Sequence, residues 1–319
     1  MKKLTLVLLA FLLVTLGSAF GLPKVTIGVS IPAADHGWTG GANWWAKKAI
    51  DDWKAKDPDI TFIFSAADTV QKQAADIEDM LVKGIKGIVI FPQDQSLTNV
   101  VEKVYKRGVY TVVLDRGVTK PVYDVWLRND DEAYARNGMQ WVVDQLKDKG
   151  NVVLIEGIPS PINDIRVNTA KDVAKQYPGI KILDSQPGNW NRQKALEVMQ
   201  NYLQKYPRID AVYTADDDML QGAMQAYAES KRKDIRVWMG GGGMKEMVKK
   251  IMDGDPVIKA DATYPPDVVA TGVSLAVLGV RGRTFEGFYQ KKLPVNIILN
   301  SEMITKTNAA DYYHPDAPF

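Results

Sequence analysis

Residues 25–64 read VTIGVSIPAADHGWTGGANWWAKKAIDDWKAKDPDITFIF and contain one complete example of the unit from which we expect the fold to be built. Its two ends, 25–30 and 60–64, are short apolar runs rich in β-branched residues, which is typical of buried strands. Between them, residues 44–56 place apolar and charged side chains at helical spacing. A strand, a helix and a second strand at this distance predict two parallel strands joined by a helical crossover.

The same unit recurs along the rest of the chain. Further strands are predicted at 87–91, 110–114, 151–155, 180–183, 211–214, 236–239 and 257–260, and further helices at 70–83, 97–107, 132–149, 166–176, 192–205 and 219–230. One series of units ends near Leu127 and a second begins after Asp130. We therefore expect an α/β fold with two doubly wound parallel-sheet lobes, joined by a multi-strand hinge near 127–130, 260–264 and 291–294.

This organisation gives expected domain boundaries. The N-terminal lobe takes 23–127 plus 263–290, the C-terminal lobe takes 128–262 plus 291–305, and 306–319 form a tail. Residues 1–19 carry two lysines, an apolar core and the small residues Gly17, Ser18 and Ala19, which is typical of a cleaved secretory signal peptide. An uncleaved anchor is the alternative. We expect the mature protein to fold outside the cytoplasm, in the periplasm.

Composition narrows the chemistry further. The chain has no cysteine, so disulfides, thiolate-ligated metals and a lipid-bearing cysteine are excluded. Its 40 basic and 38 acidic residues nearly balance, which gives no indication of a nucleic-acid partner. His36 and His314 are the only histidines, too few for a site built from several imidazoles. We expect no catalytic residues, no metal and no cofactor.

Polar and aromatic side chains follow the predicted strands where each one ends. They include Asp35, His36, Trp38, Asp68, Asp115, Arg116, Asp216 and the glycine run 240–243. Ligands of open parallel sheets bind beyond the carboxyl ends of the strands, so these residues should face one another across a cleft. Carboxylates, guanidinium groups and indole rings together suit a neutral ligand that carries many hydroxyls.

Three segments carry a resemblance to a known family. They are VLDRG at 113–117, DSQPGNWNR at 184–192 and AVYTADDDM at 211–219. The chain resembles the periplasmic ribose/galactose-type sugar-binding proteins of ABC importers, the type I periplasmic binding proteins, over essentially the whole mature length. This resemblance implies a monomeric receptor that closes on its sugar and delivers it to a membrane ABC permease.

The resemblance also implies roles for individual residues. Asp115 and Arg116 would bind ligand hydroxyls from the first lobe, and Trp38 would stack on the sugar ring. From the second lobe, Arg166 would donate hydrogen bonds and Trp190 would stack on the opposite face. Asp216 would bind a hydroxyl, while Asp217 or Asp218 caps the following helix. Asn129 and Thr263 would contribute from the hinge crossings.

Other readings of these residues stay open. Asp115 and Arg116 can form a surface ion pair, Trp190 can be a core residue, and His36 is as compatible with a structural hydrogen bond as with ligand contact. Gly242 stands where the family carries an acidic strand-end residue in a Gly-Phe-Asp-Gly pattern, so an expected acceptor is missing. The hydroxyl pattern should therefore differ from that of ribose. A hexose, another pentose, an inositol and a linear sugar alcohol remain possible ligands.

Three other functions compete with transport. A sugar-sensing receptor for chemotaxis or signalling shares this site and can coexist with transport. A sugar-responsive repressor would need an N-terminal helix-turn-helix, and the signal peptide takes that place. A carbohydrate-active enzyme would use paired carboxylates, yet an arginine next to Asp115 favours a permanently ionised acceptor over a proton donor.

Overall fold

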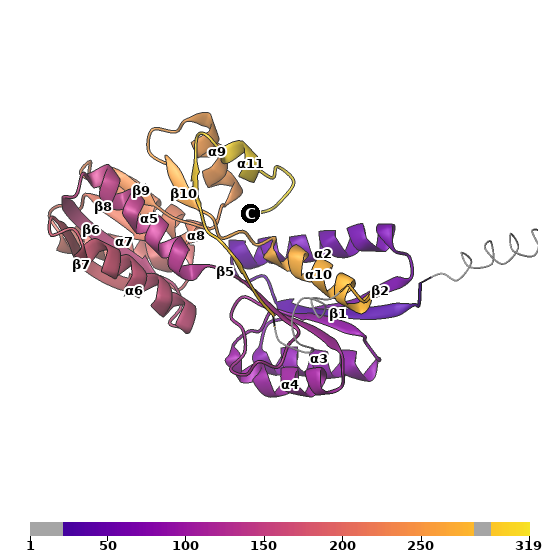
Figure 1. Cartoon of the computed structure of the whole chain (residues 1–319). Helices are drawn as coiled ribbons and strands as arrows, with labels where there is room; N and C mark the ends of the chain where they lie inside the picture. Colours follow the sequence, from indigo (N-terminus) through magenta and orange to yellow (C-terminus); the bar gives the residue numbers. More distant parts are fainter. Residues whose placement is uncertain (1–21, 284–294) are drawn as a thin grey trace, which may run out of the picture.

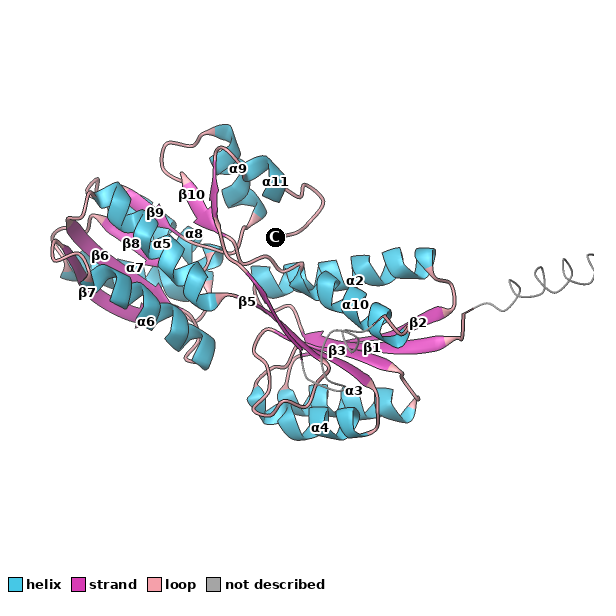
Figure 2. Cartoon of the chain, viewed as in Figure 1, coloured by secondary structure: helices cyan, strands magenta, loops and turns pink. Residues whose placement is uncertain are grey.

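The computed structural model describes residues 22–283 and 295–319, and it contains the two lobes that the sequence predicts (Figure 1). The first lobe is built on a six-stranded parallel sheet in the order β11-β5-β4-β3-β1-β2. Its strands are β1 (Val25–Pro32), β2 (Ile60–Ala67), β3 (Gly87–Ile90), β4 (Tyr110–Leu114), β5 (Val125–Asn129) and β11 (Val295–Leu299). Helices α2 (Gly37–Lys56) and α10 (Val268–Val280) cover one face, and η1 (Gln95–Leu97), α3 (Val70–Val82) and α4 (Thr98–Lys106) lie on the other (Figure 2).

The second lobe repeats this design with a four-stranded parallel sheet in the order β7-β6-β8-β9. Its strands are β6 (Gly150–Glu156), β7 (Ile180–Pro187), β8 (Ala211–Thr214) and β9 (Val237–Met239). The pair α5 (Asp131–Leu146) and α6 (Pro161–Lys175) packs on one face, and α7 (Arg192–Lys205) and α8 (Asp217–Ser230) pack on the other. Beside this sheet, α9 (Lys245–Asp253) and α11 (Ala309–Tyr312) flank an antiparallel pair, β10 (Ala260–Ala262) and β12 (Met303–Thr305).

The central strands are buried on both faces, which explains their apolar sequences. Every residue of β3 and of β8 is buried, as parallel strands covered by helices require. In the second lobe, α7 and α8 pack closely against each other at Gly222 of α8. An added Cβ there would lie 2.1 Å from the carbonyl oxygen of Arg192 in α7, so only glycine fits. Within the described residues, no helix is long and apolar enough to span a bilayer.

Within residues 22–283 and 295–319 the chain crosses between the lobes three times, and these crossings are hydrogen-bonded to one another. The amide of Asp130 in the first crossing donates to the carbonyl of Leu299 in the third at 2.9 Å. The amide of Thr263 in the second crossing donates to Glu302 at 2.9 Å, and the hydroxyl of Ser301 donates to the carbonyl of Thr263 at 2.8 Å. The hinge is therefore one bonded unit of three segments.

The third crossing lies later in the chain than the sequence suggested. The expected hinge segment 291–294 falls outside the described residues, as does the predicted signal peptide 1–19. Strand β11 pairs in parallel with β5, from Val295 opposite Val125 to Leu299 opposite Asn129. Residues 295–299 thus belong to the first sheet, and assigning all of 291–305 to the C-terminal lobe was wrong. The boundary was missed because nothing in the sequence of β5 shows that a further strand pairs with it at the edge of the sheet.

Three other boundaries differ from the prediction, two of them for local reasons that the hydrogen bonds show. The strand predicted at 257–260 is instead β10, because the Asp255 carboxylate accepts from the amides of Val257 and Ile258 and turns the chain there. Helix α6 begins at Pro161 rather than at 166, since Ser160 accepts from the amide of Asn163 and proline suits the first helical position. Helix α2 likewise begins at Gly37 rather than at 44.

Candidate functional site

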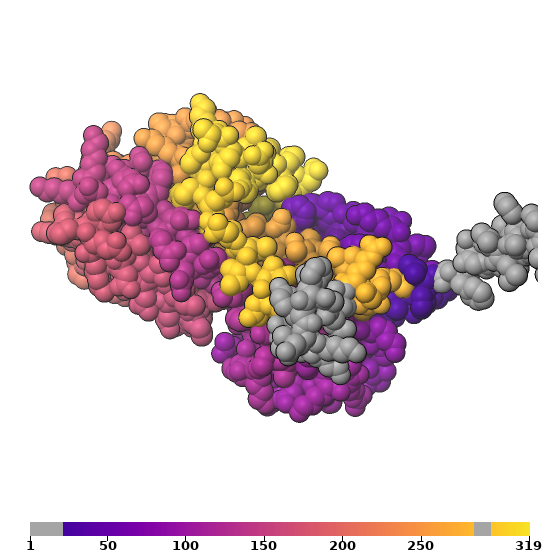
Figure 3. All heavy atoms as spheres, viewed as in Figure 1, coloured from indigo at the N-terminus to yellow at the C-terminus, as the bar shows by residue number. Residues whose placement is uncertain are grey.

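A cleft lies where the carboxyl ends of both sheets meet. Its lining comes from both of the lobes that Figure 3 shows joined side by side. The cleft holds about 440 Å³ of empty space, part of which is open to solvent. Its lining comprises His36, Trp38, Phe91, Asp115 and Arg116 from the first lobe, Tyr134, Ile162, Arg166, Trp190, Ala215, Asp216, Gly241 and Gly242 from the second, and Tyr264 from the second crossing. Strand ends from both halves therefore converge on one cavity, as the sequence predicts.

The first-lobe wall is organised by aromatic rings. Trp38 is buried in the first turn of α2, where its indole N–H donates to the carbonyl of Tyr264 at 2.7 Å. Its ring meets that of Phe91 edge-on, with 5.8 Å between the ring centres. The guanidinium of Arg116 lies 5.2 Å from the centre of the Phe91 ring and donates to the carbonyl of Gln93 at 2.5 Å. Rings and backbone thus fix both side chains before any ligand arrives.

Asp115 lies directly after β4 in a left-handed conformation, with φ of 50°. This uncommon backbone turns its carboxylate toward Tyr264, whose hydroxyl donates to it at 2.6 Å. The side chain is buried, and a carboxylate accepts more than one hydrogen bond. Asp115 therefore has acceptor capacity left for a hydroxyl placed in the cleft. This environment is not that of an exposed ion pair with Arg116.

His36 connects the two walls. It precedes the first turn of α2, and its ring stacks on that of Trp190 with 6.3 Å between the ring centres. Its Nδ1 lies 2.6 Å from the carboxylate of Asp35, and this hydrogen bond lowers the pKa of Asp35 to about 2. Asp35 itself is largely exposed and lies outside the cavity lining. The histidine thus lines the cavity while Asp35 orients its ring.

Arg166 is the most constrained charge on the second-lobe wall. Its Nε donates to the carboxylate of Asp131 at 2.7 Å, and both side chains are buried. The guanidinium carbon lies 4.5 Å from the ring centre of Tyr134 and 4.0 Å from that of Tyr264. Burial acts to lower the pKa of Arg166, but Asp131 and the two tyrosines outweigh it and raise the pKa, so the guanidinium stays charged.

Trp190 is placed by the loop before α7. Both Asn189 and Trp190 have positive φ, 59° and 51°, so the chain reverses sharply there. The indole then packs against Gly157, where an added Cβ would lie 2.4 Å from the ring. Trp190 is only 9% exposed, yet it lines the cleft. Trp190 is therefore both a buried core residue and part of the cavity wall.

The carboxylates of Asp216, Asp217 and Asp218 accept hydrogen bonds from other groups than the sequence predicted. Asp216, not Asp217 or Asp218, caps α8, because its carboxylate accepts from the amide of Met219 at 2.8 Å. Asp217 accepts from the amides of Gly241 and Met244, and Asp218 accepts from the amide of Gly37 in the first lobe. Asp216 also lines the cavity, where burial raises its pKa to about 7. One side chain thus serves both as cap and as cavity wall.

Of the remaining predicted site residues, Asp68, Asn129 and Thr263 are not part of the cavity lining, whereas Gly242 is. Asp68 is exposed between β2 and α3. Asn129 is buried at the end of β5, and its amide nitrogen has no hydrogen-bond partner among the described residues. Thr263 is buried in the second crossing, where its hydroxyl accepts from the amide of Glu302. Gly242 does line the cleft, with φ of 124°.

Sequence reasoning missed most of the aromatic lining. Phe91 ends a predicted strand and Tyr264 ends a predicted crossing, so position alone could have flagged both. Tyr134 carried no signal, because it lies one turn into α5, and Ile162 and Ala215 are unremarkable apolar residues. Within the described ranges, no group of three or more histidine or acidic side chains is arranged to hold a metal ion.

Comparison with known proteins agrees with this geometry. A family model described as the periplasmic binding protein domain matches residues 27–284. The chain is 31% identical over 244 residues to the D-allose-binding periplasmic protein of Escherichia coli, which covers 72% of this chain and 78% of that protein. It is 28% identical over 225 residues to the ribose import binding protein of Bacillus subtilis, covering 70% of this chain and 72% of the relative.

Solved structures share the fold. A solute-binding protein of an ABC transporter from Bacillus halodurans with bound myo-inositol superposes with a TM-score of 0.78 at 21% identity, covering 93% of this chain and 99% of that chain. One from Mycobacterium smegmatis with bound glycerol gives a TM-score of 0.78 at 25% identity, covering 92% and 98%. The family and these relatives are binding proteins rather than enzymes. With two lobes, three crossings and one shared cleft, the chain belongs to the periplasmic binding protein family.

Proposed function

We propose that the chain captures an uncharged sugar or polyol in the cleft, closes its lobes over it and delivers it to the permease of an ABC importer. In this proposal residues 1–19 are a cleaved signal peptide and the protein works as a periplasmic monomer without a cofactor. The observation that carries it is the shared cavity, in which Trp38 and Trp190 stand on walls from different lobes. The D-allose-binding and ribose import relatives support the ligand class.

The balance of charge in the cleft favours a neutral ligand. Arg166 already has its counterion in Asp131, and Arg116 lies beside Asp115 in sequence and on the same wall. A carboxylate or ammonium on the ligand would therefore add an unpaired charge to a largely buried site, which is costly. Hydroxyl groups avoid this cost, because each can donate to Asp115 or Asp216 and accept from an arginine.

The aromatic rings of the cleft would recognise the apolar faces of the ligand, as the charged groups would recognise its hydroxyls. Sugars and cyclic polyols present C–H faces that pack on aromatic planes, and Trp38 and Trp190 are each fixed by packing inside their own lobe. In the proposed site these two stack on the ligand, while Asp115, Arg116, Arg166 and Asp216 bind its hydroxyls and His36 closes one edge. Asp35 orients the His36 ring, whereas Asn129, Thr263 and Asp68 lie outside the cavity lining and take no part in this proposal.

A thermal-shift screen of residues 20–319 tests the ligand class. Candidates are D-allose, D-ribose, xylitol, myo-inositol and glycerol, with glutamate and lysine as charged comparators. At a ligand concentration of about 100 times Kd, binding should add roughly 2.7 kcal/mol to the free energy of unfolding. We expect at least one neutral polyhydroxylated compound to raise Tm. A shift with only the charged compounds would overturn the proposal.

Trp190→Ala localises the binding. The variant should fold and lose the ligand-induced shift, because the ring lines the cavity. Trp44→Ala is the matched control, since Trp44 lies on α2 outside the cavity lining and should keep the shift. A Trp190→Ala protein that retains the full shift would place the ligand elsewhere.

A further inference from the structure

Residues 313–319 lie across both lobes. At one end of this segment, the ring of His314 meets the ring of Trp45 on α2 edge-on, with 5.2 Å between the ring centres. In the middle, Lys245 at the start of α9 donates to the carbonyl of Ala317 at 2.6 Å and reaches that of Pro315 at 3.4 Å. The segment is therefore attached to the first lobe through α2 and to the second-lobe side through α9.

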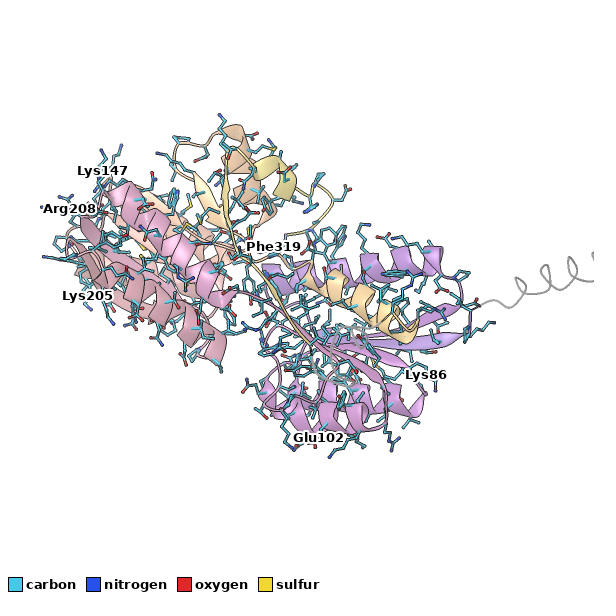
Figure 4. All side chains as sticks on the ribbon, in the orientation of Figure 1. Lys86, Glu102, Lys147, Lys205, Arg208 and Phe319 are labelled. Carbon is cyan, nitrogen blue, oxygen red and sulfur yellow. The ribbon has the colours of Figure 1, made fainter. Side chains whose placement is uncertain are left out.

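The far end of the segment places Phe319 at the junction between the lobes, as labelled in Figure 4. The ring is only 5% exposed. On the first-lobe side it packs over Gly37 and Gly41, where an added Cβ would lie 3.1 Å from Cδ2 and 2.9 Å from Cβ of Phe319 respectively. On the second-lobe side it packs over Gly242, where an added Cβ would lie 3.0 Å from its Cζ.

These contacts join elements that hinge motion would separate. Gly37 and Gly41 belong to the first turns of α2, which also carry Trp38 of the cleft, and Gly242 is itself a cleft residue. If the lobes opened, α2 would move away from the 240–243 loop, and the Phe319 ring would lose its packing on one side. A large apolar side chain favours the state in which both of its faces are covered.

We propose that residues 313–319 form a clasp that favours the closed arrangement of the lobes, with Phe319 as the positioning residue. The clasp goes beyond the proposed capture of a sugar, although it acts on the same closure. It also suits a glycine at position 242, where φ is 124° and an added Cβ would make a tight contact of 3.0 Å with Cζ of Phe319. Ligand affinity would then depend on a residue outside the cleft lining, through the fraction of molecules that are closed.

The test measures lobe separation without any ligand. Because the chain has no cysteine, Ser96→Cys and Asn168→Cys introduce the only two thiols, at exposed positions of η1 and α6 in different lobes. Spin labels there report the distance between the lobes as a distribution from double electron–electron resonance. Phe319→Ala should shift this distribution toward longer distances, and Phe319→Leu should restore part of the shorter population.

Lys245→Met provides a second, independent variant, because it removes the donor to Ala317 and keeps an apolar stem. It should shift the distribution in the same direction. Lys249→Met on the same helix is the matched control, since its exposed ion pair with Asp253 touches neither the segment nor the first lobe, and it should leave the distances unchanged. Unchanged distances in both Phe319→Ala and Lys245→Met would overturn the clasp.

A ligand-bound experiment separates this proposal from the proposed function. With a sugar that raises Tm in the screen, Phe319→Ala should weaken affinity about tenfold, as expected when a buried aromatic ring no longer favours the binding-competent state. If no sugar binds the unaltered protein, the proposed function fails while the ligand-free distances still decide the clasp. An affinity unchanged in Phe319→Ala would count against the clasp even if sugar binding is established.

Discussion

On the first-lobe wall of the cleft, Arg116 is held by the carbonyl of Gln93 and the ring of Phe91, whereas on the second-lobe wall Arg166 is paired with a buried carboxylate and flanked by two tyrosines. Arg116 donates to a neutral carbonyl, so its charge remains available to a ligand. Arg166 directs its charge to Asp131 and thereby stabilises the lining, and it offers a ligand only its remaining N–H donors. Residues that look equivalent in sequence thus differ in how much of their hydrogen-bonding capacity remains available.

Removing the second-wall arginine should have the largest effect. Arg166→Leu leaves the Asp131 carboxylate buried without its partner, which should lower the free energy of unfolding by about 3–5 kcal/mol. Urea denaturation with an unchanged slope measures this loss. Arg136→Leu is the matched control, because both side chains of the Arg136–Glu132 ion pair are exposed and such a pair is worth about 0–1 kcal/mol. Equal losses of unfolding free energy in the two variants would show that the buried ion pair of Arg166 contributes no more to stability than an exposed one.

Removing charge from the first wall should affect binding more than folding. Asp115→Asn keeps an oxygen for the Tyr264 hydroxyl but gives up the ionised acceptor, so affinity should fall about 10- to 100-fold, as expected for loss of a charge-assisted hydrogen bond. Isothermal titration calorimetry with the sugar found in the screen measures this. Asp68→Asn, at an exposed position outside the lining, should bind as the unaltered protein does. An Asp115→Asn protein with full affinity would show that this carboxylate has only a structural role.

A smaller effect should appear in the pH dependence of stability. The folded-state pKa of Asp216 is raised by burial to about 7, so between about pH 4 and pH 7 the folded protein holds a proton that the unfolded chain releases. The free energy of unfolding should therefore fall as pH rises through this window, by at most about 1.4 kcal/mol per pH unit for one proton. Asp216→Asn should cap α8 equally well and flatten part of the slope.

Urea denaturation at pH 5, 6, 7 and 8 provides the measurement. Asp130→Asn changes the same kind of helix cap on α5, at a half-buried position, and should retain the slope of the unaltered protein. If Asp216→Asn keeps the full slope as well, the carboxyl group of Asp216 is not the group that takes up the proton.

The pattern of strands in the sequence was enough to locate the cavity, because the carboxyl ends of parallel strands meet at one edge of a sheet regardless of how the helices pack. It could not assign the hydrogen bonds, since Asp216, Asp217 and Asp218 are identical in type and adjacent in sequence, and only the packing of α8 decides which one faces the helix amides. Nor could it find Tyr134, because a ring that reaches the cleft from inside a helix leaves no trace in the strand-end pattern.

The bonded hinge has a consequence for how the molecule moves. Twisting one lobe against the other would strain the hydrogen bonds from the Asp130 amide to the Leu299 carbonyl and from the Thr263 amide to the Glu302 carbonyl, whereas a bend would distribute small dihedral changes over all three crossings. A hinge that bends in this way would return Trp38 and Trp190 to the same places on the two cleft walls each time the lobes close, so that every ligand would meet the same arrangement of rings.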